Sequence, residues 1–278
     1  MQKILGCEGS FEESEIILFG AGFDSTTCYR PGARFGPSAL RNESYGIESY
    51  SPYQDKDVLD YLICDSGDLE LPFGDPKPAL ALITKRIEKI AENKKFPFMI
   101  GGEHLITLGA IKALIKFYPD LSIIHFDAHA DLRDEYLGRK LSHACVMHRC
   151  HELVGDGKIF QFGIRSGEKE EFLWGQDHVS TRRFNFHGLR EVVAELGDRP
   201  VYFTLDLDIL DPSIFPGTGT PEAGGVSFNE LRKAISLVSK CNLVGADMNE
   251  LSPHYDPSGV STIVANKILR EMLLYFLE

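Results

Sequence analysis

The sequence of 278 residues has no long apolar run, no excess of basic residues and no closely spaced cysteine pair. No stretch approaches the roughly 18 to 20 apolar residues of a membrane-spanning helix, and MQKILGCEGSFEES at the start lacks the apolar core of a signal peptide. The formal charge of −12 disfavours nucleic acid and anionic membranes as partners, because both are polyanions that bind Lys and Arg. We therefore expect a soluble, cytoplasmic protein.

The six cysteines form no CxxC motif, which is typical of a chain with reduced thiols. Proline-, glycine- or serine-rich linkers and low-complexity tracts are absent as well, so residues 1–278 are expected to fold as a single domain. A hydrophobic content of 43% and a charged content of 25% are ordinary for globular proteins and argue against disorder.

Short apolar segments alternate with amphipathic segments along the chain. Apolar runs typical of buried strands cover residues 15–20, 59–65, 96–102, 121–127, 158–164, 200–208 and 242–248, with a weaker eighth run at 178–181. Helical patterns lie between them, for example at residues 78–95, 104–118, 188–197 and 227–240, with a final helix at 261–278. This alternation predicts an α/β fold with a mostly parallel sheet that helices cover on both faces.

Four of the expected strands change from apolar to polar at their carboxyl ends, in MIGGEH, IIHFDAHAD, TLDLDILDP and GADMNE. In open α/β sheets ligands bind in the crevice at this edge. The four polar endings are therefore candidates for one shared site.

Asp127, His129 and Asp131 are spaced two residues apart, which places their side chains on one face of an extended chain. Grouped carboxylates and imidazoles resist burial unless a cation lies between them. Three further candidate ligands stand at other strand ends: His104, Asp206 and Asp208. Six such groups fit two divalent ions, and an oxygen-rich set without thiolates favours Mn²⁺ over structural Zn²⁺.

Seven segments resemble the ureohydrolases, the manganese enzymes that include arginase and agmatinase. They are PGARFGPSALR (31–41), DSGDLE (65–70), GGEH (101–104), FDAHAD (126–131), SHA (142–144), TLDLDILDPSIFPGTGTPEAGG (204–225) and ADMNELSPHYDPSG (246–259). The resemblance covers nearly the whole chain. It implies a three-layer α/β/α fold with an eight-stranded, mostly parallel sheet, and a homo-oligomer, either a trimer or a hexamer.

The resemblance also implies two Mn²⁺ ions per chain. One ion would be held by His104, Asp127, Asp131 and Asp206, and the other by Asp127, His129, Asp206 and Asp208. Asp127 and Asp206 would bridge the two ions. His125 is expected to point to the opposite face from His129, and His254 lies in the loop SPHYDP, so both are expected to be structural or surface histidines.

Catalytic roles are implied for Asp131, His143 and Glu250. His143 would give a proton to the leaving amine, a role that the near-neutral pKa of histidine suits. Glu250 would pair with the guanidinium group of the substrate, and Glu222 would assist through a hydrogen bond. The chain departs from the family pattern at Ala144, where a glycine commonly follows the histidine.

The identity of the substrate depends on two segments. GTGTPE (217–222) resembles agmatinases, since arginases usually carry an apolar residue in place of Glu222. In the loop 132–142, Asp134 and Glu135 could attract the distal ammonium of agmatine, whereas Arg133, Arg139 and Lys140 could bind a carboxylate.

We therefore expect a small cationic guanidino substrate, agmatine, to be converted to putrescine and urea. The alternatives are an arginase, a guanidinobutyrase or another guanidino hydrolase. Two further alternatives come from other classes: a binding protein for metal and guanidines without turnover, and an amide hydrolase with one zinc ion on the related deacetylase scaffold.

Overall fold

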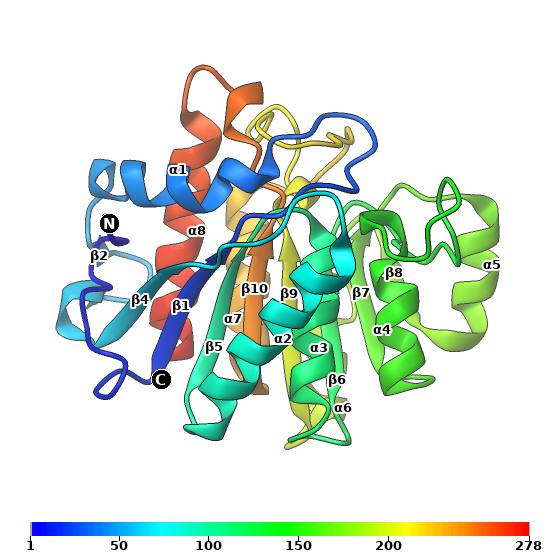
Figure 1. Ribbon diagram of the computed structural model, residues 1–278, viewed down its shortest axis with the longest axis horizontal. Helices are drawn as coiled ribbons and strands as arrows, with labels where there is room; N and C mark the ends of the chain where they lie inside the picture. The colour runs from blue at the N-terminus through cyan, green and yellow to red at the C-terminus, as the bar shows by residue number, and fades with distance from the viewer. Residues whose placement is uncertain (1, 278) are drawn as a thin grey trace.

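The computed structural model describes residues 2–277, which form a central sheet of eight strands with helices on both faces (Figure 1). The strand order is β4-β1-β5-β10-β9-β6-β7-β8, and all neighbouring strands are parallel. The strands are β1 Ile16–Ala21, β4 Ile63–Asp68, β5 Phe96–Gly101, β6 Ser122–Phe126, β7 Ile159–Ile164, β8 Ser180–Arg183, β9 Pro200–Asp206 and β10 Asn242–Asn249. The predicted eight-stranded parallel sheet is confirmed, including its weak eighth strand.

The helices form one layer on each face of this sheet (Figure 1). One layer contains α2 Pro76–Glu92, α3 Thr107–Leu114 and α4 Val146–Val154, and the other contains α1 Gly36–Glu43, α6 Leu189–Leu196, α7 Phe228–Val238 and α8 Val260–Phe276. Helix α5, Lys169–His178, lies beside the edge strand β8. A small antiparallel pair, β2 Tyr50–Ser51 and β3 Lys56–Asp57, is separate from the main sheet.

The sheet has a hydrophobic core on each face, and strand β1 contributes to both. Ile16 and Leu18 pack into one core, whereas Ile17 and Phe19 pack into the other. Successive side chains of a strand point to opposite faces, so a strand that helices cover on both sides must be apolar at every position. This requirement explains the continuous apolar runs in the sequence.

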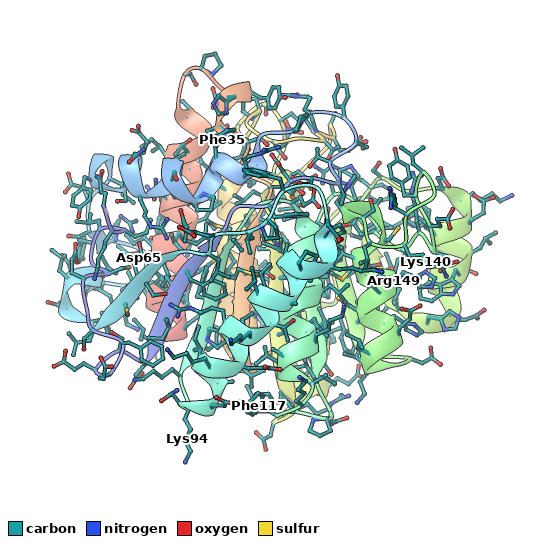
Figure 2. All side chains as sticks on the ribbon, viewed as in Figure 1. Phe35, Asp65, Lys94, Phe117, Lys140 and Arg149 are labelled. Carbon is teal, nitrogen blue, oxygen red and sulfur yellow. The ribbon has the colours of Figure 1, made fainter. Side chains whose placement is uncertain are left out.

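A buried ion pair connects two of the segments that resemble the ureohydrolases. Arg41 in α1 donates from Nε and Nη2 to the two carboxylate oxygens of Asp65 in β4, at 2.7 and 2.9 Å. The side chain of Arg41 also binds Asp68 at the end of the same strand. Two parallel hydrogen bonds fix the relative orientation of both groups, so α1 is held against the edge strand β4, on which Asp65 is labelled in Figure 2.

None of the helices within residues 2–277 combines the length and the apolar character that crossing a membrane requires. The 17-residue helix α8 is instead packed in the protein interior, between α1 and α7.

Candidate metal centre and active site

The sheet order brings the four polar strand endings together. Strands β5, β10, β9 and β6 are consecutive neighbours in the sheet, although they are far apart in the sequence. His104 follows β5, Glu250 follows β10, Asp206 ends β9 and Asp127 follows β6. Because all four strands are parallel, their carboxyl ends lie at the same edge of the sheet.

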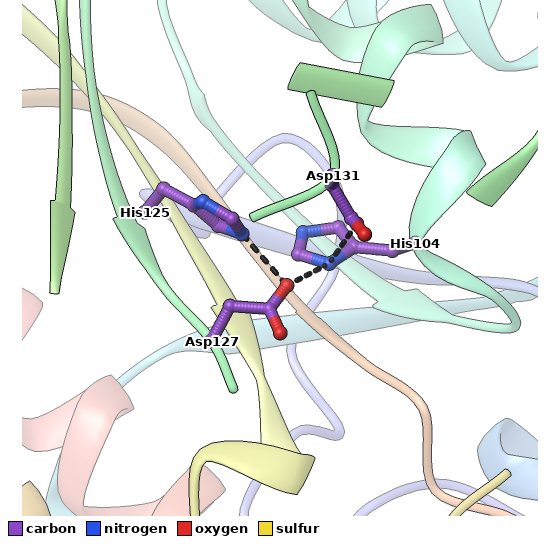
Figure 3. A group of neighbouring side chains, drawn as sticks. All are labelled: His104, His125, Asp127 and Asp131. Atoms are coloured by element: carbon purple, nitrogen blue, oxygen red, sulfur yellow. Dashed lines mark hydrogen bonds and ion pairs between the residues drawn. The ribbon is translucent and has the colours of Figure 1, made fainter. Parts of the chain in front are cut away.

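One cluster of side chains forms around the imidazole of His104. Its Nδ1 lies 3.0 Å from Asp127 Oδ2, 3.2 Å from Asp206 Oδ2 and 3.7 Å from Asp131 Oδ2. Figure 3 shows the carboxylates of Asp127 and Asp131, both from the segment that follows β6, approaching the ring of His104. The four residues match the set that the family resemblance assigns to one ion.

A second cluster forms around His129. Its Nδ1 lies 2.9 Å from Asp208 Oδ2 and 3.5 Å from Asp127 Oδ1. Asp127 therefore belongs to both clusters, with one carboxylate oxygen facing each histidine. The oxygens of a carboxylate in this position are suited to bridging two cations.

Backbone hydrogen bonds hold the carboxylates in place. The N–H of His129 donates to Asp127 Oδ1 at 2.6 Å, and the N–H of Asp208 donates to Asp206 Oδ1 at 2.7 Å. Asp131 adopts a left-handed backbone conformation with φ of 55°. This conformation is unfavourable for a residue with a side chain, and such strain is concentrated at functional sites.

The charges of the two clusters are poorly compensated by protein groups alone. Burial and the nearby carboxylate of Asp127 raise the pKa of Asp131 well above its usual range. Burial, Asp208 and Asp127 raise the pKa of Asp206 in the same way. Burial opposes a charge on His104, but Asp127 and Asp206 outweigh it and raise the pKa of the imidazole. Divalent cations would relieve this crowding of negative charge.

The donor atoms fit a metal site. His104 Nε2 lies 2.7 Å from Thr204 Oγ1, whereas Nδ1 is buried and makes no hydrogen bond, although three carboxylates face it. An imidazole whose other nitrogen is fixed by a hydrogen bond is the usual arrangement of a metal ligand. The residues present therefore fit a cation at this position.

The prediction that His125 points away from the site is wrong, because its ring lies beside Asp127 and His104. His125 is fully buried, and its Nε2 lies 2.8 Å from Asp127 Oδ2 (Figure 3). Its Nδ1 lies 3.0 Å from Gln161 Nε2. It stands two residues before Asp127, so the alternation that groups residues 127, 129 and 131 also includes it. That spacing was the signal that could have identified it. His254 is exposed at the surface, as expected.

His143 begins a short 3₁₀ helix, His143–Cys145, which contacts Thr26 in the segment that follows β1. Its backbone N–H donates to Thr26 Oγ1 at 3.1 Å, and the hydroxyl of Thr26 donates to Glu103 Oε1 at 2.5 Å. Burial lowers the pKa of the His143 imidazole to about 4, so the ring is neutral at pH 7. Ala144 lies within the 3₁₀ helix, where alanine fits without the backbone freedom of glycine.

Glu250 is buried and contacts the backbone of His104. Its Oε1 accepts a hydrogen bond of 2.8 Å from the N–H of His104, and its backbone is left-handed with φ of 68°. Burial, Asp206 and Glu103 raise its pKa well above the usual range. A cationic group placed beside this carboxyl would favour its ionised form.

Glu222 lies at the exposed side of the His129 cluster. Its Oε1 accepts a hydrogen bond from Ser166 Oγ at 2.9 Å and lies 3.9 Å from His129 Nε2. Its side chain is 42% exposed, so it is accessible to a ligand that approaches His129 from solvent.

The two acidic residues of the loop 132–142 differ in their surroundings. Asp134 Oδ1 accepts a hydrogen bond from Arg149 Nη2 at 2.6 Å and lies 3.4 Å from Lys140 Nζ. These two cations are labelled on the same side of the molecule in Figure 2, and Arg149 lowers the pKa of Asp134. Glu135 is exposed. The charge of Asp134 is thus already balanced by protein groups.

An α/β sheet with paired acidic and imidazole clusters at its carboxyl edge defines a candidate metallohydrolase, and comparison with known proteins gives its family. The Arginase family matches residues 14–275, and the chain belongs to this family. It is 47% identical over 273 residues to the agmatinase of Bacillus subtilis (strain 168), which covers 96% of this chain and 94% of that protein.

Solved structures agree with this relationship. A structure from Clostridium difficile is 50% identical, covers 96% of this chain and 98% of its own, and superimposes with a TM-score of 0.93. The agmatine ureohydrolase of Thermoplasma volcanium is 34% identical, covers 100% of this chain and 94% of its own, and gives a TM-score of 0.90.

Proposed function

We propose that this protein is a manganese-dependent agmatinase, which hydrolyses agmatine to putrescine and urea. The proposal rests on the two clusters at the carboxyl edge of the sheet, in an arginase-family chain that is 45% to 47% identical to four agmatinases over 95% to 96% of its length. The two clusters would hold two Mn²⁺ ions per chain, with ligands His104, Asp127, His129, Asp131, Asp206 and Asp208.

The reaction adds water across the bond between the guanidinium carbon and the alkyl nitrogen of agmatine. Oxygen goes to the carbon, which leaves as urea, and both protons of the water end on the alkyl nitrogen, which carries the positive charge of the guanidinium away as an alkylammonium; one of these protons must arrive as the bond breaks. When bound, the metal ions would activate the water and stabilise negative charge on the attacked group. The protein must bind the guanidinium, orient it and move one proton.

Glu250 and His143 are the side chains that we assign to these tasks. The buried carboxylate of Glu250 would pair with the guanidinium and orient it over the clusters, because two parallel hydrogen bonds fix both groups. Burial lowers the pKa of His143 to about 4, below the near-neutral value expected from the sequence, so the ring would hold a proton only during the reaction and would pass it readily to the departing amine. Glu222 would contribute a hydrogen bond at the exposed side, and Asp131 would support catalysis as a ligand.

Urea release from manganese-loaded protein tests the proposal. Agmatine, N(1)-aminopropylagmatine, guanidinobutyrate and arginine share the guanidinium but differ in distal charge, and the second is included because an N(1)-aminopropylagmatine ureohydrolase from Thermococcus kodakarensis is 40% identical. We expect agmatine to have the highest kcat/KM. Its advantage over guanidinobutyrate and arginine should be roughly tenfold to a hundredfold, the cost of an unpaired charge at the distal end.

Competition among the four compounds, followed by chromatography of the released amines, measures this order directly. A higher kcat/KM for another compound would change the substrate and leave the chemistry intact. The absence of urea from all four compounds, with two manganese ions bound, would overturn the hydrolase and favour a binding protein.

The loop 132–142 is proposed to bind the distal ammonium of agmatine. Substitution of its two acidic residues should affect kcat/KM to different extents. Asp134 is neutralised by Arg149 and Lys140, so Asp134→Asn should change kcat/KM for agmatine by less than about threefold. Glu135→Gln should lower it by about threefold to tenfold while sparing guanidinobutyrate. Equal effects on both substrates would show that this loop does not recognise the distal charge.

The proposal includes a homo-oligomer, a trimer or a hexamer, on the basis of the family resemblance. Sedimentation analysis would then give a mass that is three or six times the 31.1 kDa of one chain.

A further inference from the structure

A second group of metal-ligand side chains lies outside the active site, where the end of α4, the following loop and the end of α5 meet. The carboxylate oxygen Oδ1 of Asp156 lies 2.8 Å from His151 Nε2 and 2.6 Å from His178 Nδ1. Two imidazole nitrogens thus approach the same carboxylate oxygen, and the three atoms lie within 4.8 Å of one another.

The surrounding backbone holds the three groups in this arrangement. Asp156 lies between Gly155 and Gly157, whose φ angles of 84° and 68° allow the tight turn that follows α4. The N–H of Gly155 donates to the carbonyl of His151, and the N–H of Gly157 donates to the carbonyl of His178. Both backbone bonds connect the loop of Asp156 to the residues whose side chains bind it.

Both imidazoles are also positioned by Trp174 of α5. The ring of His178 stacks on the indole with centroids 4.3 Å apart, and the ring of His151 meets the indole edge-on at 4.8 Å. The exposed fractions of the side chains are 16% for His151, 31% for His178 and 68% for Asp156. The rings are therefore held in place, while an ion can reach their nitrogens from solvent.

We propose that His151, Asp156 and His178 form a further metal site, which binds one late first-row divalent cation such as Zn²⁺ or Ni²⁺. Two imidazoles and one carboxylate are ligands that these ions prefer, and three protein ligands leave further positions for water. To bind the ion, each neutral imidazole must carry its single proton on the nitrogen that faces away from Asp156, so that Nε2 of His151 and Nδ1 of His178 offer their lone pairs.

The sequence contains a single tryptophan, so indole fluorescence reports on this site directly. Ni²⁺ is paramagnetic and quenches a nearby indole, whereas Zn²⁺ competes for the same ligands without quenching. Titration of manganese-loaded protein with Ni²⁺ should give saturable quenching that Zn²⁺ reverses.

Asp156→Asn, His151→Gln and His178→Gln should each weaken the apparent affinity for Ni²⁺ by about tenfold or more, because each removes one ligand. Asp156→Asn leaves both rings and the indole unchanged, so its effect cannot come from altered stacking. His187→Gln, at an exposed histidine in a different loop, is the matched control and should titrate like the wild type.

Three results would overturn the assignment. Quenching could persist in the Asp156 variant and both histidine variants. It could instead be lost in His148→Gln, since His148 also stacks on Trp174 and belongs to a different group with Asp134 and Glu152. Finally, quenching could rise in proportion to released Mn²⁺, which would place the Ni²⁺ ion in the active site.

Discussion

Asp206→Asn is expected to lower kcat/KM for agmatine by on the order of a thousandfold and to reduce bound manganese below two ions per chain. Loss of groups that only support a metal ligand commonly costs tenfold to a hundredfold, and loss of a ligand shared by two ions should cost more. Asparagine keeps the Oδ1 acceptor for the N–H of Asp208 but removes the negative charge at Oδ2, 3.2 Å from His104 Nδ1.

The same substitution should stabilise the metal-free protein. Burial and the neighbouring carboxylates raise the pKa of Asp206, so the folded chain binds this proton more tightly than the unfolded chain does. Stability is then fully present below the unfolded pKa near 4 and is lost as the pH rises toward the folded pKa. Asparagine does not ionise, so the variant does not lose stability in this way. Without metal, the melting temperature of the variant should exceed that of the wild type, and the difference should grow as the pH rises above 5.

With manganese bound, we expect the wild type to have the higher melting temperature. An ion at one hundred times its dissociation constant stabilises a folded protein by about 2.7 kcal/mol, and the variant should lose much of this gain. Thermal melts with and without Mn²⁺, together with metal analysis, measure both effects on one sample. A variant that loses one ion and keeps its activity would support the alternative with a single metal ion.

His125→Asn provides a graded comparison for Asp206→Asn. His125 contacts Asp127 Oδ2 at 2.8 Å and is not among the six proposed ligands, so its loss should cost tenfold to a hundredfold in manganese affinity. If His125→Asn and Asp206→Asn lowered the manganese affinity by the same factor, His125 would itself be a metal ligand.

Apolar periodicity predicted the parts of the fold that bury continuous apolar surface. Strand β8 was identified only weakly, because its residues Ser180–Arg183 are half-buried or exposed at the edge of the sheet. Helices α1, α4 and α5 are not among the segments named from their apolar pattern. In α5 the buried residues, Glu171 and Gly175, form no apolar stripe, and in α1 the buried side includes Arg41, which is paired with Asp65.

The candidate site was predictable where one segment supplied several groups at regular spacing. Asp127, His129 and Asp131 are recognisable from the sequence because an extended chain places alternate side chains together. The neighbours of each strand could not be predicted in this way. The order β5-β10-β9-β6 arises from crossover connections, which local sequence patterns do not encode. The group of His151, Asp156 and His178 likewise needed the structure, since α4 and α5 meet only in the folded chain.

Glu250→Gln is expected to reduce kcat/KM for agmatine by roughly a hundredfold to a thousandfold while both manganese ions stay bound. Glutamine has nearly the same shape and can still accept the 2.8 Å hydrogen bond from the N–H of His104, so the His104 cluster should keep its geometry. It cannot supply the negative charge that pairs with the guanidinium. Removing one partner of a buried charge pair costs about 2 to 5 kcal/mol, which corresponds to this loss.

Glu222→Gln is the matched control for Glu250→Gln, because it makes the same chemical change at a carboxylate that is 42% exposed rather than buried. Water screens its charge, so we expect a loss of less than about tenfold. Urea kinetics and metal content measured on both variants separate the two roles. If Glu250→Gln kept activity within tenfold of the wild type, Glu250 would not be the partner of the guanidinium. If it lost manganese, its main contribution would be to the position of His104, whose backbone it binds, and the orientation of the substrate would have to come from the exposed side of the site.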